Sequence, residues 1–348
     1  MNKPHIPHPQ ANELSNDTKK SMRTRIISAI VMVAIVLPLL FLGEFSFIVL
    51  MAFLLLWSVY EIIHCAGKKY SIWLYIISMV LAVVIAFWPI IYNLFLASTN
   101  RLFFDGMQIP LKDFRLFSGF IGLSVPITAL VIGAAGLFFT AVADPGFEVR
   151  DACYVFTMVI IISLGIQSIT YLRFVPLYEH YYIEGMTPIK YFSGFHLFQS
   201  TLLVIYCALA TFLTDIGAYF VGVFFGRHKM NPRVSPKKTW EGFVGGLVIS
   251  SLFSFLFAMI FAWCKMPILS FLDVNHWYYI LILSVVIPPV SVLGDFVFSS
   301  IKRYYGVKDF SHLIPGHGGV LDRIDSIIFS FLISALLVSL VVYWTPIV

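Results

Sequence analysis

The stretch WYYILILSVVIPPVSVLGDFVF, residues 277–298, is apolar and long enough to cross a bilayer, since a spanning helix needs about 20 such residues. A polar segment, SSIKRYYGVKDFSHLIPGHGGVLDRID (299–325), leads from it to another apolar run at 324–347. The whole chain is 59% hydrophobic and only 12% charged, with a mean hydropathy of +0.90. This composition excludes a soluble protein and predicts an integral membrane protein.

Apolar segments of spanning length recur along the chain, so we expect an all-α, polytopic fold with about nine transmembrane helices. The expected spans are approximately 26–42, 45–64, 71–96, 116–143, 152–172, 197–225, 243–263, 277–298 and 324–347. An odd number of spans places the two termini on opposite sides of the membrane. With the N-terminus in the cytoplasm, 17 of the 23 lysines and arginines lie on the inner side, as the positive-inside rule requires.

The chain divides into three regions by composition. Residues 1–25 form a polar N-terminal tail, and 26–196 contain about five spans with few features beyond packing. Residues 197–348 contain about four spans and the polar groups of functional interest. Within this last region we expect cytoplasmic loops at 226–242 and 299–323.

The remaining sequence features limit the function classes. Outer loops are expected at 97–115 and 173–196, and the aromatic residues of the second suit the membrane interface. The net charge of +5 is mostly on the cytoplasmic side, where it suits anionic lipid headgroups, so no nucleic-acid partner is expected. The four cysteines form no CxxC pair, so neither a disulfide framework nor a zinc site follows.

Two aspartates, Asp215 and Asp295, lie within apolar helical stretches. An acidic side chain near the middle of a span costs about 3 kcal/mol on insertion scales, so each needs a partner, an ion or water. Ser299 and Lys302 follow Asp295 at helical spacing and should share its helix face. A buried Asp–Lys structural pair is the alternative to a functional site here.

The turn PGHGG, residues 315–319, cannot continue a helix, and its glycines permit positive φ and close approach of a ligand. Asp322 and Asp325 follow at the start of the last span, with Arg323 between them. Together with Asp295 they suit Mg²⁺, which usually takes one or two carboxylates and completes its shell with water and phosphate oxygens. Helix capping is the alternative, and it explains one aspartate more readily than three.

Two loops therefore carry groups suited to phosphates. The loop GRHKMNPRVSPKKTWEGFVGG (226–246) has the chemistry of a polyphosphate cradle, although it contains neither GxxxxGK[ST] nor GxGxxG. His317, in the glycine turn, suits phosphate hydrogen bonding or a loop role better than proton transfer, because a phosphate nucleophile is already ionised at neutral pH. Two anions about 4 Å apart repel by about 4 kcal/mol at an effective dielectric of about 20, so the cations would serve to bring them together.

The string from Ser299 to Asp325 resembles the C-terminal signature of the phosphatidate cytidylyltransferase (CDP-diacylglycerol synthase) family. Its matching positions are Ser299, Lys302-Arg303, Lys308-Asp309, His317-Gly318-Gly319, Asp322-Arg323 and Asp325. The segments TDIGAYFVGVFFGRHK and SPKKTWEG resemble upstream motifs of the family, and RIISA near the N-terminus does so more loosely. The motifs cover about 211–326, whereas the polar tail and 97–196 depart from a compact bacterial member.

The resemblance implies an Mg²⁺-dependent enzyme that transfers the cytidylyl group of CTP to phosphatidate, giving CDP-diacylglycerol and pyrophosphate in phospholipid synthesis. It implies direct metal coordination by Asp295 and Asp322, a ligand or supporting role for Asp325, and room for a second cation. Phosphate contacts in catalysis are expected from Lys302, Arg303 and Arg323. Substrate binding is expected from Ser235, Lys237, Lys238, Thr239, Lys308, His317, Gly318, Gly319 and Asp215.

The implied setting is the bacterial cytoplasmic membrane, with the active site on its cytoplasmic side and phosphatidate in the inner leaflet. Two other function classes stay open. A CTP-dependent lipid kinase would transfer the γ-phosphoryl group and release CDP rather than pyrophosphate. An ion-coupled transporter also uses intramembrane aspartates, but it needs no triphosphate-sized basic loops, and the chain shows no internal repeat. A homodimer is plausible for a helical membrane enzyme.

Overall fold

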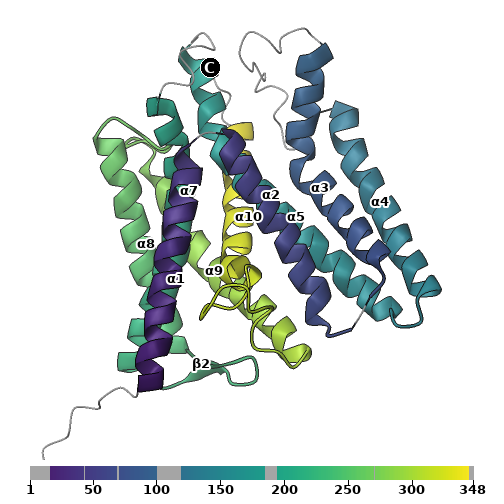
Figure 1. Cartoon of the computed structure of the whole chain (residues 1–348). Coiled ribbons are helices and arrows are strands. Elements are labelled where there is room, and N and C mark those ends of the chain that lie inside the picture. Colours follow the sequence, from purple (N-terminus) through teal and green to yellow (C-terminus); the bar gives the residue numbers. More distant parts are fainter. Residues whose placement is uncertain are drawn as a thin grey trace, which may run out of the picture.

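The computed structural model describes residues 16–42, 44–68, 70–99, 119–184, 194–269 and 271–344. Within these residues, nine helices are long and apolar enough to cross a membrane. They pack side by side in one bundle (Figure 1). The expected all-α, nine-span fold is confirmed, and the chain is a multi-pass integral membrane protein.

The helices alternate in direction along the bundle. They are α1 (Asn16–Phe41), α2 (Glu44–Cys65), α3 (Ile72–Thr99), α4 (Gly119–Ala143), α5 (Val149–Glu184), α7 (Gly194–Phe225), α8 (Trp240–Trp263), α9 (Trp277–Tyr304) and α10 (Leu321–Trp344). Two short strands, β1 (Lys229–Asn231) and β2 (Ser235–Thr239), form an antiparallel hairpin between α7 and α8. In Figure 1 the start of α1 lies at the bottom and the end of α10 at the top, so the two lie at opposite ends of the bundle.

Some helices run further than the apolar segments that predict them. Helix α1 begins at Asn16, inside the predicted polar tail, because that segment contains neither proline nor glycine after residue 15. Helix α5 continues through Glu184, inside the predicted outer loop 173–196. Polar residues leave the bilayer without leaving the helix, since water at the membrane surface solvates their side chains. The remaining parts of these predictions, residues 1–15, 100–118 and 185–193, lie outside the described residues.

The two predicted cytoplasmic loops are also partly regular. The loop 226–242 contains the β1–β2 hairpin and the start of α8. The loop 299–323 begins as the last turn of α9 and ends as the first turn of α10, which leaves 305–320 as the connecting segment. We call this segment the glycine loop, because it contains the PGHGG turn.

Small residues let α7 and α8 approach closely. Gly242, Gly246 and Ser250 recur every four residues on α8 and are buried. A β-carbon on Gly246 would lie 2.6 Å from the carbonyl oxygen of Thr214 on α7, and the Ser250 hydroxyl donates to the Ala210 carbonyl at 2.6 Å. Close backbone packing of this kind is typical of membrane helices. It holds the hairpin that joins α7 to α8 at one end of the bundle.

Helix α10 packs against α9 and α5 in the interior of the bundle. A β-carbon on Gly165 of α5 would lie 2.6 Å from Ile328 of α10, so glycine is needed at this crossing. At the crossing with α9, a β-carbon on Gly294 would lie 3.0 Å from Phe329 and 3.1 Å from the carbonyl oxygen of Asp325. This crossing brings the acidic positions of α9 and α10 together.

Candidate active site

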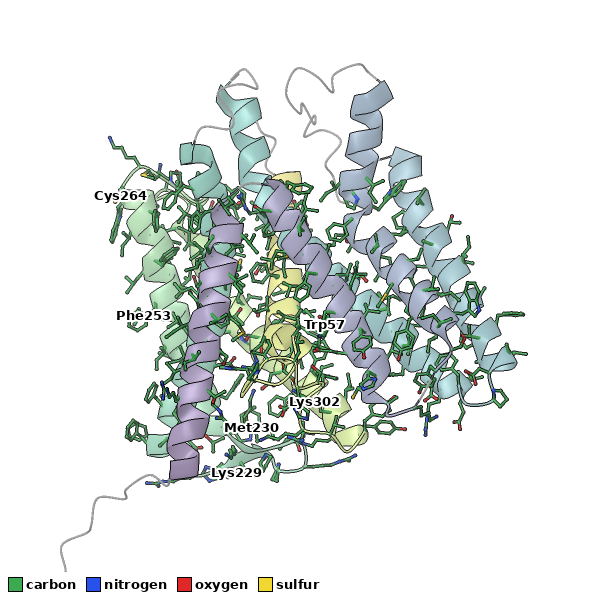
Figure 2. All side chains as sticks on the ribbon, in the orientation of Figure 1. Trp57, Lys229, Met230, Phe253, Cys264 and Lys302 are labelled. Carbon is green, nitrogen blue, oxygen red and sulfur yellow. The ribbon has the colours of Figure 1, made fainter. Side chains whose placement is uncertain are left out.

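The polar segments of the chain gather at one end of the bundle. The hairpin and the glycine loop both lie at the lower end in Figure 1, where α1 also begins. In Figure 2, Lys302 lies in the lower part of the bundle above Lys229 and Met230 of the hairpin, whereas Cys264 lies at the opposite end. The structure thus brings together the two basic loops that the sequence predicts to act as one site.

Lys302 forms the central ion pair of this site. Its ammonium nitrogen lies 2.8 Å from Asp322 Oδ1 and 3.7 Å from Asp325 Oδ2. The side chains of Lys302 and Asp322 are only 9% and 2% exposed. Removing one partner of such a buried pair leaves an uncompensated charge, so the pair constrains how α9 and α10 pack. The predicted phosphate-binding role of Lys302 stays a prediction.

Asp322 also organises the glycine loop. Its Oδ2 atom accepts hydrogen bonds from the backbone N–H groups of Phe310 at 2.8 Å and Gly319 at 2.9 Å. Gly318 has a φ of +86°, a backbone conformation that favours glycine. A β-carbon at this position would also lie 2.9 Å from Asp322 Oδ2, so the available space requires glycine as well. The capping alternative therefore describes part of what Asp322 does. Its predicted role as a direct metal ligand stays a prediction.

Asp295 connects α9 to the hairpin. One of its oxygens forms an ion pair with Lys238 of β2, and the other accepts a hydrogen bond from Ser299 at 3.1 Å. The ammonium of Lys238 also lies 4.9 Å from the centroid of the Phe296 ring. Asp295 and Ser299 share a helix face as their spacing predicts, and the cation beside them comes from a different element.

Asp295 directly follows Gly294, which packs against the Asp325 backbone at the α9–α10 crossing, so the carboxylates of Asp295 and Asp325 influence each other electrostatically. Like charges at such range are most stable when a cation lies between them. Among the described residues, no group of three or more His, Cys, Asp or Glu side chains forms a ready-made metal cluster. A pair of carboxylates nevertheless fits Mg²⁺, whose remaining positions are usually filled by water and substrate phosphate oxygens.

Two predicted substrate-binding or catalytic residues have structural partners. Thr239 is buried and caps α8, accepting a hydrogen bond from the Gly242 N–H at 3.2 Å. Arg303 donates to the carbonyl oxygens of Val234 at 3.4 Å and Val307 at 3.0 Å, which ties the hairpin to the end of α9. Arg303 remains exposed, so its guanidinium can also meet a phosphate.

Other predicted residues border the same region. The exposed cations are Lys237, Lys308 and Arg323, and Ser235 is half-buried. Asp215 is exposed on α7, and it interacts electrostatically with Lys238, Asp295 and Arg323. It therefore belongs to the same charged region, on the side that α7 contributes.

Sequence reasoning missed Glu61 on α2. Its side chain is fully buried. It accepts hydrogen bonds from Val320 N at 2.9 Å, Leu321 N at 2.7 Å, the Ser311 hydroxyl at 2.6 Å and Trp57 Nε1 at 3.0 Å. These donors belong to the glycine loop, to the start of α10 and to α2 itself. Glu61 thus fixes the loop together with Asp322.

Residue 319 has to be glycine beside this carboxylate, because a β-carbon there would lie 2.6 Å from Glu61 Oε1. A signal for Glu61 was present in the sequence. It is an acidic residue in the apolar run LLLWSVYEIIHC (54–65), which is the same anomaly that marks Asp215 and Asp295.

The first helix also reaches the glycine loop. Ser28 Oγ lies 2.7 Å from His317 Nδ1, and the side chain of Arg25 lies against Gly316. Burial and the nearby charges of Arg323 and Arg25 lower the pKa of His317 below its usual value of 6.5, so the ring is mainly neutral at pH 7. Only the loose RIISA resemblance pointed to this part of the chain.

The protein is thus a polytopic helical membrane protein with carboxylates, a buried lysine and a basic hairpin at one end of its bundle. Residues 23–341 match the cytidylyltransferase family, and the chain belongs to that family.

Relatives within the family agree with the motif resemblance. The chain is 37% identical over 150 residues to a phosphatidate cytidylyltransferase of Bacillus subtilis (strain 168), covering 43% of this chain and 49% of the relative. It is 42% identical over 130 residues to the Haemophilus influenzae protein of the same name, covering 37% and 43%. It is 39% identical over 142 residues to the phosphatidate cytidylyltransferase of Staphylococcus haemolyticus (strain JCSC1435), covering 39% of this chain and 50% of the relative. The chain thus spans about half the length of the curated relatives it matches.

Proposed function

We propose that the protein transfers the cytidylyl group of CTP to phosphatidate, forming CDP-diacylglycerol and releasing pyrophosphate. The observation that carries this proposal is the meeting of the α9 and α10 carboxylates with the basic hairpin and the glycine loop at one end of a membrane bundle. Family membership and the names of the relatives support it.

In the proposed reaction, an oxygen of the phosphatidate phosphate attacks the α-phosphorus of CTP. The bond from that phosphorus to the bridging oxygen breaks, and its electron pair leaves with pyrophosphate. The attacking phosphate is already ionised at neutral pH, so no side chain has to remove a proton. The protein contributes orientation of the two substrates and stabilisation of the charge that moves to the leaving group.

Asp295 and Asp325 are the residues best placed to hold Mg²⁺, since their carboxylates act on each other across the α9–α10 crossing. Lys238 and Ser299 orient Asp295, and Ser326 orients Asp325 through a backbone N–H at 2.7 Å. When bound, the ion would polarise phosphate oxygens and offset their charge. A second cation and direct ligation by Asp322 remain proposals of the same kind.

The exposed cations around this centre would neutralise the substrates. These exposed cations belong to four different elements: Lys237 to the hairpin, Arg303 to α9, Lys308 to the glycine loop and Arg323 to α10. Several cations are needed, because a triphosphate and a lipid phosphate repel each other on approach. The convergence of elements accounts for the concentration of charge at one end of an otherwise apolar molecule.

We place this end of the bundle on the cytoplasmic side of the bacterial inner membrane. The excess of lysine and arginine on that side, 17 of 23 residues, supports this orientation. Phosphatidate would then approach from the inner leaflet, with its acyl chains left in the bilayer and its headgroup at the site. A homodimer remains a prediction from the class of protein.

Turnover of radiolabelled CTP by the purified protein in detergent, with phosphatidate and Mg²⁺, tests the proposal. CDP-diacylglycerol and pyrophosphate are the expected products, whereas CDP would indicate a lipid kinase, and ion flux in liposomes without lipid substrate would indicate a transporter. Asp295→Asn should lower turnover by about 100-fold or more while the protein still inserts into membranes. Asp273→Asn, in the connection between α8 and α9, is the matched control. Near-normal turnover in Asp295→Asn would refute the role assigned to this carboxylate.

A further inference from the structure

The first helix has two properties that are unusual together. The part of α1 that spans the membrane, Arg23–Phe41, buries none of its most apolar window inside the protein. Yet its first turns contact the glycine loop nearly 300 positions later in the chain, through Ser28 and Arg25. A helix with no fully buried residue in its most apolar window therefore contacts the most polar part of the site near the start of its span.

Ser28 and His317 form the joint between these elements. The Ser28 hydroxyl lies 2.9 Å from the Thr24 carbonyl oxygen, 3.0 Å from that of Arg25 and 2.7 Å from His317 Nδ1. A hydroxyl has one hydrogen to donate and can accept as well, so it can bond a helix carbonyl and the imidazole at once. The neutral ring has one N–H, so either Nδ1–H donates to Ser28 or the Ser28 hydroxyl donates to Nδ1. His317 is thus held to α1 through Ser28.

This joint places Arg25 of α1 at the turn that carries His317, and Arg323 of α10 follows His317 by six positions in the chain. The side chain of Arg25 lies against the turn, since a β-carbon on Gly316 would be 2.9 Å from Arg25 Cγ. Both arginines act electrostatically on His317, and both are exposed. Among the ion pairs of the described residues, neither arginine has a carboxylate partner, although Asp215 interacts with Arg323 at longer range.

Two guanidinium groups that both act on His317 concentrate positive charge at this turn, and an anion bound there would offset it. Guanidinium binds phosphate with two parallel hydrogen bonds, which makes a pair of arginines well suited to a phosphate group. The chemistry of Arg25 and Arg323 therefore selects a phosphate, either that of a nucleotide or that of a lipid.

The surroundings of Arg25 favour the lipid. The residues that follow it on α1 present apolar side chains outward: Ile26, Ile27 and Ile30 are 56%, 51% and 62% exposed. Acyl chains lying along these side chains would bring their own phosphate to the level of Arg25, at the start of the span. A nucleotide would gain nothing from this apolar surface.

We propose that Arg25 and Arg323 form the subsite for the phosphate of the lipid substrate, and that the Ser28–His317 contact holds α1, and with it Arg25, against the glycine loop. This inference rests on the proposed function, because it names the part of that site that takes phosphatidate. Arg25 is then a binding residue, and Ser28 is a positioning residue that does not touch the substrate.

Steady-state kinetics in mixed micelles separates the two phosphate sources. Arg25→Gln should raise KM for phosphatidate by about tenfold or more at saturating CTP, while KM for CTP at saturating phosphatidate stays within about twofold. Arg25→Lys should lie between, since it keeps the charge but loses the bidentate geometry. Arg23→Gln is the matched control, because Arg23 lies two residues earlier on a different face of the same helix. A rise in KM for CTP alone would assign Arg25 to the nucleotide and overturn the proposal.

The positioning role of Ser28 has its own test. Ser28→Ala should raise KM for phosphatidate, and Ser28→Thr, which restores a hydroxyl, should recover most of the loss. In a protein that already carries His317→Ala, Ser28→Ala should add nothing, because residues that act through one another are not additive. Full additivity of the two substitutions would show that Ser28 acts only through helix packing, and that part of the proposal would fall.

Equilibrium binding keeps this inference separate from the proposed activity. Binding of phosphatidate in nanodiscs, compared with diacylglycerol and without CTP, should weaken by about tenfold in Arg25→Gln but not in Arg23→Gln. If the wild type turns over CTP but Arg25→Gln binds phosphatidate normally, the lipid subsite is refuted and the proposed function stands. If the wild type has no turnover but Arg25→Gln still loses phosphatidate binding, the subsite stands and the proposed function fails.

Discussion

Replacing Glu61 by alanine should open the glycine loop without unfolding the bundle. Glu61 is fully buried and accepts the N–H groups of Val320 at 2.9 Å and Leu321 at 2.7 Å. A hydrogen bond to a charged group contributes about 1.5–3 kcal/mol, so loss of these two should lower the free energy of local opening by at least about 3 kcal/mol. Since about 1.4 kcal/mol is a factor of ten, amide exchange at the start of α10 should accelerate by about 100-fold.

Hydrogen exchange read by mass spectrometry on peptides spanning 311–325 measures this opening directly. Glu61→Ala should exchange faster there, while peptides from α8 keep their wild-type rates. Glu61→Gln should lie between, because its one carbonyl oxygen can keep some of the donors. Glu148→Ala is the matched control, since Glu148 is an exposed glutamate in the connection before α5. Unchanged exchange at 311–325 in Glu61→Ala would refute the conclusion that this carboxylate holds the loop.

Three further changes test the packing and electrostatics of the bundle. Lys302→Met should leave Asp322 buried without its cation and lower the free energy of unfolding by about 3–5 kcal/mol. A melting midpoint in detergent equal to that of the wild type would contradict this. Gly246→Ala should destabilise the protein, because the new β-carbon would lie 2.6 Å from the carbonyl oxygen of Thr214. Gly136→Ala is the control, since its β-carbon would lie 3.4 Å from the nearest atom, on Ile77. Equal melting midpoints for the two variants would argue against close α7–α8 packing. The pKa of His317 is lowered from 6.5 in the folded protein. As the pH falls through this value, the unfolded chain binds a proton more readily than the folded protein does, so stability should fall. Melting midpoints measured against pH should fall less in His317→Gln than in the wild type.

The sequence predicted the fold through local composition. Each apolar segment of sufficient length identified a helix, because partitioning into lipid depends mainly on the side chains of that segment. It could not predict where the helices end. Residues 16–25 and 173–184 continue their helices beyond the bilayer-length segments, and the second does so through Pro176, so residue type did not mark either end.

The sequence also located most of the candidate site, because a carboxylate in an apolar helix is anomalous wherever it occurs. Asp215 and Asp295 were found in this way, whereas Asp322 and Asp325 were found because they follow the glycine turn at the start of the last span. Asp322 and Asp325 both lie beside Lys302 in the structure. The same criterion applies to Glu61, which sequence reasoning missed. For Thr239, the sequence could not distinguish a substrate ligand from the helix cap that the structure shows.

The sequence by itself determined the membrane class, the family and the charged end of the molecule, since each of these depends on residue types and on short-range spacing. Only the tertiary structure decided which groups meet. It paired Lys238 with Asp295, Glu61 with the start of α10, and Ser28 with His317. These partners are far apart in the chain, and they meet because small residues such as Gly294 and Gly246 set how closely the helices cross. Helix crossings depend on the shapes of two surfaces at once, which no single segment specifies.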